Sequence, residues 1–103
     1  MLPISVIISV FNAEKYLSES LDSVLNQSMS AKEIIVINDG SKDHSIEILN
    51  RYGKKIKLID RENKGVPYSV NEGISLVKQP WITFNDGDDI WAPNKLELQY
   101  NYL

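Results

Sequence analysis

The sequence predicts an α/β domain of three layers, α/β/α, in which helices cover both faces of a mostly parallel sheet. Short apolar runs, of which the first two are dense in Val and Ile, alternate four times with apolar residues at helical spacing, and polar residues that favour turns follow these runs. No repeat, linker or low-complexity segment interrupts this alternation. We therefore expect residues 1–103 to form one domain, or one part of a larger domain.

The first half of the chain contains two of these strand–helix pairs. Residues 4–11 are dense in Val and Ile and predict a strand that is buried on both faces. Asn12 suits the cap of the next helix, whose apolar residues recur at helical spacing: Leu17, Leu21, Val24 and Leu25. Residues 33–37 predict the second strand, and the turn at residues 38–41 leads into a second helix.

The second half contains the other two pairs. Residues 57–60 predict a short third strand, and Val70, Ile74 and Val77 mark a third helix. Residues 81–84 predict the fourth strand, and Pro93 suits the first turn of a last helix. A four-stranded parallel sheet of this kind keeps an open edge, so we expect a fragment whose missing residues, after residue 103, cover that edge.

Composition excludes several classes of protein. Of the 103 residues, 43% are hydrophobic and 24% are charged, as in an ordinary globular domain. A net charge of −3 does not fit a nucleic-acid-binding protein, and the absence of cysteine excludes disulfides and thiolate sites. No apolar run approaches the roughly 20 residues of a membrane helix, and no signal peptide is recognisable. We expect a soluble, cytoplasmic chain.

Polar side chains gather where the predicted strands end. In chain order they are Asn12, then Asn38 and Asp39, then residues 60–63, then Asp86, Asp88 and Asp89. Ligands of open α/β sheets bind outside the carboxyl ends of the strands, so this edge is the predicted ligand site. The sequence has no G-x-G-x-x-G after the first strand, no phosphate-binding P-loop and no G-x-S-x-G motif.

The acidic segment at residues 86–89 is the most specific of these features. Three carboxylates within four residues repel one another unless a cation or protons intervene. Oxygen ligands suit Mg²⁺ or Mn²⁺, which bind one or two carboxylates together with phosphate oxygens. The alternative is a solvated acidic turn before the last helix. Because the segment follows a buried strand on the same edge as Asp39, we favour the cation site.

Other residues admit two interpretations. Asp39 can accept a hydrogen bond from an imide or a ribose hydroxyl, or it can simply belong to the turn that starts a helix. His44 is expected on the surface and Trp81 is expected to pack at the start of its strand, whereas Trp91 can pack or wall the ligand site. The basic stretch at residues 51–64 is either a solvated rim or a surface that attracts a diphosphate or an anionic membrane.

Taken in order, these motifs resemble a known family. They are residues 5–12, residues 21–27 with Ser23 and Gln27, residues 35–41, 63–65, 71–74 and 84–89. From Pro3 onward the chain resembles the N-terminal, donor-binding half of a family 2 glycosyltransferase of the GT-A fold, the nucleotide-diphospho-sugar transferase type. The sequence departs from the family at Ser9, where Pro is usual, at Asn38, where Asp is frequent, and at Val70, where Arg is frequent.

The resemblance implies a set of site residues. Ser9, Phe11, Asn12 and Asp39 would line the nucleobase pocket; Asn63, Gly65 and Asn71 would also bind substrate; Asp86 and Asp88 would contact the ribose and diphosphate; and Asp88 and Asp89 would hold Mg²⁺ or Mn²⁺. The implied reaction is an inverting transfer from a nucleotide-diphosphate sugar, usually a UDP-sugar. It assigns no catalytic residue to this chain, because the family's base lies in the C-terminal half, after Leu103.

The implied partners are a nucleotide-sugar donor and a saccharide or lipid-linked acceptor in bacterial cell-surface or extracellular polysaccharide synthesis. Peripheral contact with the inner face of the membrane through a longer protein, and a homo-oligomer, are also expected. Two alternatives stay open. A sugar-phosphate nucleotidyltransferase would need a Gly-rich basic loop after the first strand, and a receiver-like regulatory module would need acids after the first and third strands.

Overall fold

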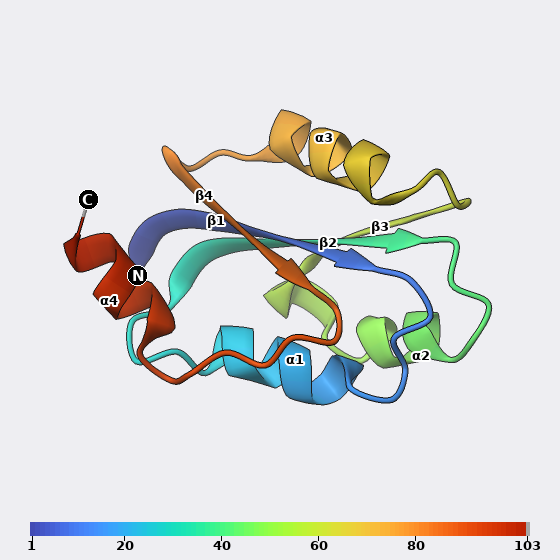
Figure 1. Cartoon of the computed structure of the whole chain (residues 1–103), viewed down its shortest axis with the longest axis horizontal. Helices are drawn as coiled ribbons and strands as arrows, with labels where there is room; N and C mark the ends of the chain where they lie inside the picture. The colour runs from blue at the N-terminus through green and yellow to red at the C-terminus, as the bar shows by residue number, and fades with distance from the viewer. Residues whose placement is uncertain (103) are drawn as a thin grey trace.

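The computed structural model describes residues 1–102 and has the predicted alternation of strands and helices (Figure 1). The elements in chain order are β1 (Leu2–Val10), α1 (Leu17–Leu25), β2 (Ala31–Asp39), α2 (Ser45–Asn50), the short 3₁₀ turn η1 (Gly53–Lys55), β3 (Lys57–Arg61), α3 (Val66–Leu76), β4 (Trp81–Asp86) and α4 (Lys95–Asn101).

The four strands form one parallel sheet in the order β3-β2-β1-β4. β1 therefore lies inside the sheet, where Ile8 pairs with Val36 on one side and with Asn85 on the other. All four strands point the same way, so their carboxyl ends meet at one edge of the sheet. This edge carries the polar segments singled out in the sequence.

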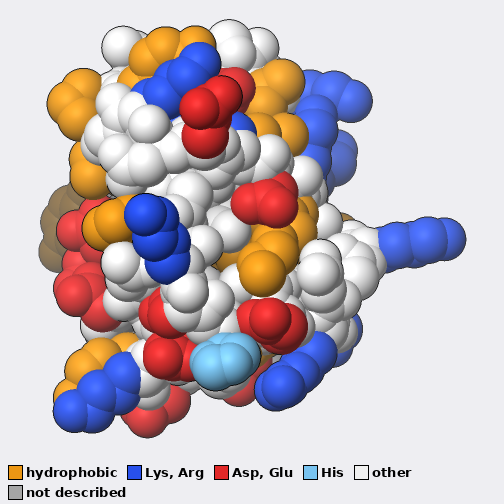
Figure 2. Space-filling model, turned by 90° about the vertical axis from the view of Figure 1, so that its right-hand side faces the viewer, with side chains coloured by type: hydrophobic (Ala, Val, Ile, Leu, Met, Phe, Trp, Pro, Cys, Tyr) orange, Lys and Arg blue, Asp and Glu red, His pale blue; other side chains and the backbone are white. Residues whose placement is uncertain are grey.

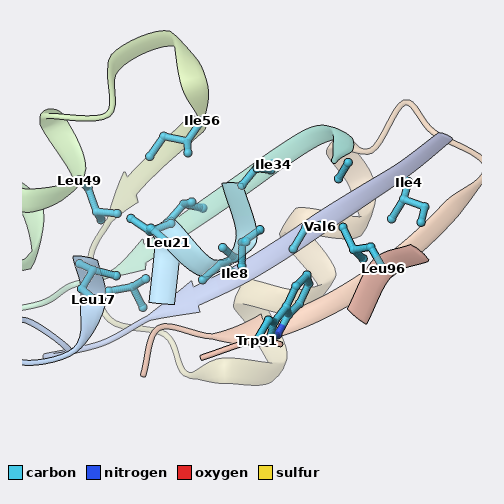
Figure 3. Packing of buried hydrophobic residues seen from close by; sticks show 14 of the residues in the cluster. Ile4, Val6, Ile8, Leu17, Leu21, Ile34, Leu49, Ile56, Trp91 and Leu96 are labelled. Carbon is cyan, nitrogen blue, oxygen red and sulfur yellow. The ribbon is translucent and has the colours of Figure 1, made fainter. Parts of the chain in front are cut away.

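Helices cover both faces of the sheet, which confirms the predicted three-layer α/β/α fold. α3 lies alone on one face, whereas α1 and α2 lie on the other (Figure 1). The main core lies on the α1 side, where Val6 and Ile8 of β1 contact a cluster that includes Leu17, Leu21 and Leu96 (Figure 3). Burial of these aliphatic side chains is the main source of stability of the fold.

On the other face of the sheet, α3 packs very closely against β1. A Cβ atom added to Gly73 of α3 would lie only 2.6 Å from Cγ2 of Ile7, which is itself buried. Glycine at this position therefore lets the helix backbone rest directly on β1. A glycine inside a helix costs about 1 kcal/mol relative to alanine, but packing against Ile7 requires Gly73 at this position.

Several local predictions are wrong. α1 begins at Leu17 after Tyr16, so Asn12 does not cap it, and Pro93 precedes Asn94, the capping residue of α4, instead of lying in its first turn. Of the two interpretations left open for Trp91, the structure shows packing, because Trp91 is buried in the core cluster and does not wall the ligand site. Trp81 does not pack as expected, because it is 45% exposed on the outer strand β4.

The β4 edge of the sheet is open and apolar. Among residues 1–102 no other strand pairs with the outer side of β4, and Trp81, Ile82 and Phe84 are all exposed there. An unpaired edge with apolar side chains is a surface on which another chain can pair. Separately, none of the helices described in residues 1–102 has the length and apolar character needed to cross a membrane.

Candidate functional site

The strand registers bring the predicted site residues to one edge. Ser9 of β1 lies opposite Asp86 of β4, and Asn38 of β2 lies opposite Asp60 of β3. Figure 2 shows this end of the molecule, where acidic and basic side chains lie among exposed hydrophobic ones. The parallel topology thus places groups from distant parts of the chain on one surface.

A cavity of about 500 Å³ opens between the ends of β1 and β4. Five predicted site residues line it: Ser9, Phe11, Asn12, Asp86 and Asp88. Lys15, Tyr16 and Val66 also line it and were not predicted. Lys15 and Tyr16 lie within six residues of the end of β1, which indicates a place at the ligand edge of the sheet. They were not predicted because the helix was expected to begin at Asn12.

The cavity offers three kinds of recognition. Phe11 is 48% exposed and presents an aromatic face, while the ammonium of Lys15 lies 5.2 Å from the ring centre of Tyr16. Asp86 and Asp88 contribute carboxylates to the same space. A flat ring can stack on the aromatic side chain, and an anionic group can bind the ammonium or a cation held by the carboxylates.

The wall formed by residues 12–14 is held by the loop that follows β2. Asn12 has a positive φ of 51°, and its Oδ1 accepts a hydrogen bond from Lys42 N at 2.8 Å, while its own N–H donates to Ser41 Oγ at 3.0 Å. Ala13 N donates to Ser45 Oγ and Glu14 N donates to Asp43 Oδ2. Asn12 is therefore a loop residue fixed in the left-handed region, where asparagine is tolerated.

The acidic cluster forms the other side of the cavity. Asp86, Asp88 and Asp89 each place one carboxylate oxygen within 4.8 Å of the others, and all three side chains are exposed. Partial burial raises the pKa of Asp86, and the charges of Asp89 and Asp88 raise it further. Because hard cations prefer oxygen ligands, this donor set fits Mg²⁺ or Mn²⁺.

Asp39 lies in a different environment from the one expected. It is 1% exposed, and its carboxylate accepts hydrogen bonds from Arg61 Nη1 at 2.5 Å, Lys64 N at 2.8 Å and Gly65 N at 2.9 Å. Arg61 also donates to Glu72 Oε1 at 2.8 Å. The sequence places Asp39 on the rim outside the core, whereas the structure makes it the buried anchor of the loop before α3.

This loop also contacts the turn after β2. Asn63 Nδ2 donates to the carbonyl oxygen of Asp39 at 3.1 Å. Gly40 has a φ of 71°, and a Cβ there would lie 2.4 Å from Asn63 N, so only glycine allows this contact. Asn63 and Gly65 therefore belong to the Asp39 network, beside the cavity. Asn71 lies apart from both, in a shallow groove of about 350 Å³ on α3 with Tyr68, Glu72 and Ser75.

Polar residues of α1 and the following turn hold the segment after β4 in place. Ser23 Oγ accepts a hydrogen bond from Trp91 N at 3.0 Å, and Gln27 donates to the carbonyl oxygen of Ala92 at 2.7 Å and accepts from Leu96 N at 2.9 Å. Ser23 and Gln27 were part of a sequence motif without an assigned role. Ser23 and Gln27 thus hold residues 91–96, the part of the chain that directly follows the acidic residues 86–89.

Comparisons with known proteins agree with this arrangement. The family model described as Glycosyl transferase family 2 matches residues 5–103. An uncharacterized glycosyltransferase of Rickettsia prowazekii is 42% identical over 100 residues, which are 97% of this chain and 31% of that protein. This chain thus spans about a third of the length of that relative.

Solved structures have the same fold. The crystal structure of S. aureus TarS in complex with UDP matches with a TM-score of 0.86 at 27% identity, over 98% of this chain and 32% of that one. The TarS structure in complex with UDP-GlcNAc matches with a TM-score of 0.79 at 29% identity, over 98% of this chain and 30% of that one.

Proposed function

The chain belongs to glycosyltransferase family 2, and from this premise we propose that it forms the donor-binding part of an inverting glycosyltransferase. The donor is a nucleotide-diphosphate sugar, a UDP-sugar, and the product is a cell-surface or extracellular polysaccharide. The observation that carries the proposal is the cavity between β1 and β4, in which an aromatic face, an ammonium and two carboxylates meet.

At one end of the cavity we place the nucleobase. The exposed ring of Phe11 can stack on a pyrimidine, and Ser9 and Asn12 offer polar atoms at its edge. Asp39 is buried and accepts hydrogen bonds from Lys64 N and Gly65 N, so it acts on this end by holding the loop that leads to Val66, a residue of the cavity wall. Asn63 and Gly65 support this end through their contacts with Asp39. Asn71 lies apart from it on α3, so any contact it makes is with a more distant part of the substrate.

At the other end we place the ribose and diphosphate, with Mg²⁺ or Mn²⁺ held by Asp88 and Asp89. The bound cation would neutralise the negative charge that develops on the leaving diphosphate. Asp86 lines the same side of the cavity, and its carboxylate can accept a hydrogen bond from a ribose hydroxyl. Lys15 provides a second positive charge on the same cavity, toward the phosphates.

The remaining steps of the reaction lie outside these 103 residues in this proposal. Because the chain spans only 31% of its R. prowazekii relative, we place the catalytic base and the acceptor site in the part that is not represented here. The acceptor is a saccharide or a lipid-linked glycan. We further propose a cytoplasmic protein that contacts the inner face of the membrane peripherally, supported by the basic side chains of Lys54 and Lys55 on η1.

Calorimetric titration with UDP, with and without Mn²⁺, tests the proposal. We expect Mn²⁺ to strengthen UDP binding, and Asp88→Asn to weaken Mn²⁺-dependent binding by about 10–100-fold, as expected for loss of a charged partner. Glu47→Gln is the matched control, because it removes the same charge from an exposed position on α2 outside the cavity. Equal UDP affinity with and without Mn²⁺ would remove the cation from the proposal, and no UDP binding in either condition would overturn it.

A further inference from the structure

Asn85 is a buried polar residue directly before the acidic cluster. It is 6% exposed and pairs in register with Ile8, so its side chain lies on the same face of the sheet as the core around α1. Its Nδ2 donates to Ser20 Oγ at 3.2 Å and to the carbonyl oxygen of Asp89 at 3.4 Å. Its Oδ1 is the one buried side-chain polar atom without a partner among residues 1–102.

Ser20, which accepts the hydrogen bond from Asn85, also contacts Asp86 at the start of the acidic loop. Ser20 is fully buried on α1, and its Oγ donates to the carbonyl oxygen of Asp86 at 3.3 Å. Asp89 N also donates to that carbonyl at 3.1 Å. The backbone at both ends of the loop, Asp86 and Asp89, is thus tied to one buried pair of side chains, Ser20 and Asn85.

These hydrogen bonds from Ser20 and Asn85 are needed because the acidic loop, residues 86–89, carries carboxylates that repel one another. Three carboxylate oxygens lie within 4.8 Å of one another, and like charges at this separation repel. Without support from behind, such a loop would relax by moving its charges apart. A cation would then have to bring them together again, and that ordering would reduce its affinity.

Asn85 buries an amide oxygen that has no hydrogen-bond partner, which lowers the stability of the fold, and this indicates that Asn85 serves the function. An apolar residue of the same size would fill the space beside Ile8 without a buried amide oxygen that lacks a partner. Places where a sequence departs from the pattern required by its fold are typically functional. We propose that Asn85, acting through Ser20 and the Asp89 carbonyl, is a positioning residue that sets the divalent-cation affinity of the acidic loop.

This inference rests on the proposed function, because it assumes that the loop binds a divalent cation. The test measures Mn²⁺ affinity of the 103-residue chain from the electron paramagnetic resonance signal of free Mn²⁺, with and without saturating UDP. The main variant is Asn85→Leu, which keeps the number and branching of the side-chain heavy atoms and removes both donor contacts. We expect its Mn²⁺ affinity to fall 10–100-fold, as for loss of a group that orients metal ligands.

A stability measurement separates positioning from simple packing. Because Asn85→Leu removes the unpartnered oxygen from the core, its urea midpoint should stay equal to the parent's or rise. Ser20→Ala is the second variant and should weaken Mn²⁺ binding in the same direction. The double variant should lose no more than Asn85→Leu alone, since both belong to one tie. Ser75→Ala removes an exposed hydroxyl bonded only to Glu72 O and is the matched control.

The Mn²⁺ affinities and urea midpoints together decide whether Asn85 positions the acidic loop. Weaker Mn²⁺ binding by Asn85→Leu with an unchanged or higher urea midpoint supports the inference. If Mn²⁺ affinity changes by less than twofold in Asn85→Leu and Ser20→Ala while Asp88→Asn abolishes binding, the inference is wrong and the cation site stands. A parallel loss of stability and affinity shows a merely structural residue. Absence of Mn²⁺ binding by the parent chain, with or without UDP, overturns both the inference and the cation site.

Discussion

Removing the carboxylate of Asp39 should destabilise the fold as well as weaken nucleotide binding. Asp39 is buried, and three donors converge on it from Arg61 and from the backbone of Lys64 and Gly65. Asp39→Ala leaves the Arg61 guanidinium, whose side chain is 10% exposed, with Glu72 as its remaining acidic partner. The loop before α3 would lose its anchor at the same time.

The size of the effect follows from these contacts. Breaking a buried ion pair by removing one partner costs about 3–5 kcal/mol. Because Glu72 still accepts a hydrogen bond from Arg61, we expect the lower end, about 3 kcal/mol. At a urea dependence of about 1–3 kcal/mol/M, this loss lowers the unfolding midpoint by roughly 1–3 M.

The assay is urea unfolding followed by circular dichroism for the parent, Asp39→Ala, Arg61→Met and the double variant. Arg61→Met should cost less than Asp39→Ala, because Asp39 keeps its two backbone donors. The double variant should lose less than the sum of the single losses, since the two residues share one interaction. A loss below 1 kcal/mol for Asp39→Ala, or additive losses, would refute the role of Asp39 as a structural anchor.

Three further predictions concern other parts of the molecule. Gly73→Ala should lower the free energy of unfolding by about 1–3 kcal/mol in a urea titration, because the new methyl group overlaps Ile7; an unchanged midpoint would contradict the close approach of α3. Burial raises the pKa of Glu33, but hydrogen bonds to its carboxylate outweigh this and lower it overall, as also occurs at Asp43. Their stabilising effect is present above their ordinary pKa values of 4.5 and 3.8 and is lost as the pH falls through the lowered values, so the urea midpoint should drop below about pH 4.5 and drop less in Glu33→Gln. Ile82→Lys should reduce self-association of the chain in sedimentation velocity, since it places a charge on the open apolar edge of β4, and a parent chain that stays monomeric at high concentration would contradict this expectation.

Sequence patterns were sufficient for the order and type of the elements, because the first two strands are dense in Val and Ile and each of the four strands is followed by apolar residues at helical spacing. They were less reliable at the element ends. Asn12 has the composition of a helix cap, but its hydrogen bonds go to a loop nearly 30 residues away, which local sequence does not reveal. Trp91 looked equally suited to the core and to a ligand wall, and only tertiary packing distinguishes the two.

The candidate site was also predicted in part. Parallel topology alone implies that Ser9 and Asp86 share one edge, and the register of β1 with β4 confirms it. The environment of Asp39 could not be predicted, because it depends on Arg61, which comes from a different strand. The roles of Ser20 and Asn85 were likewise hidden, since serine and asparagine in apolar surroundings give no indication of the partner they find.

The central place of β1 has a consequence for how the chain is made. Of the four strands described in residues 1–102, β1 is synthesised before the others, yet its residue 4 pairs with residue 81, so one side of this apolar strand stays unpaired until β4 is made. At a synthesis rate of about 5–20 residues per second, the delay is roughly 4–15 s. During that time β1 can pair with the wrong segment or with another nascent chain. The strand that is best protected in the finished protein is thus the one most exposed while it is being synthesised.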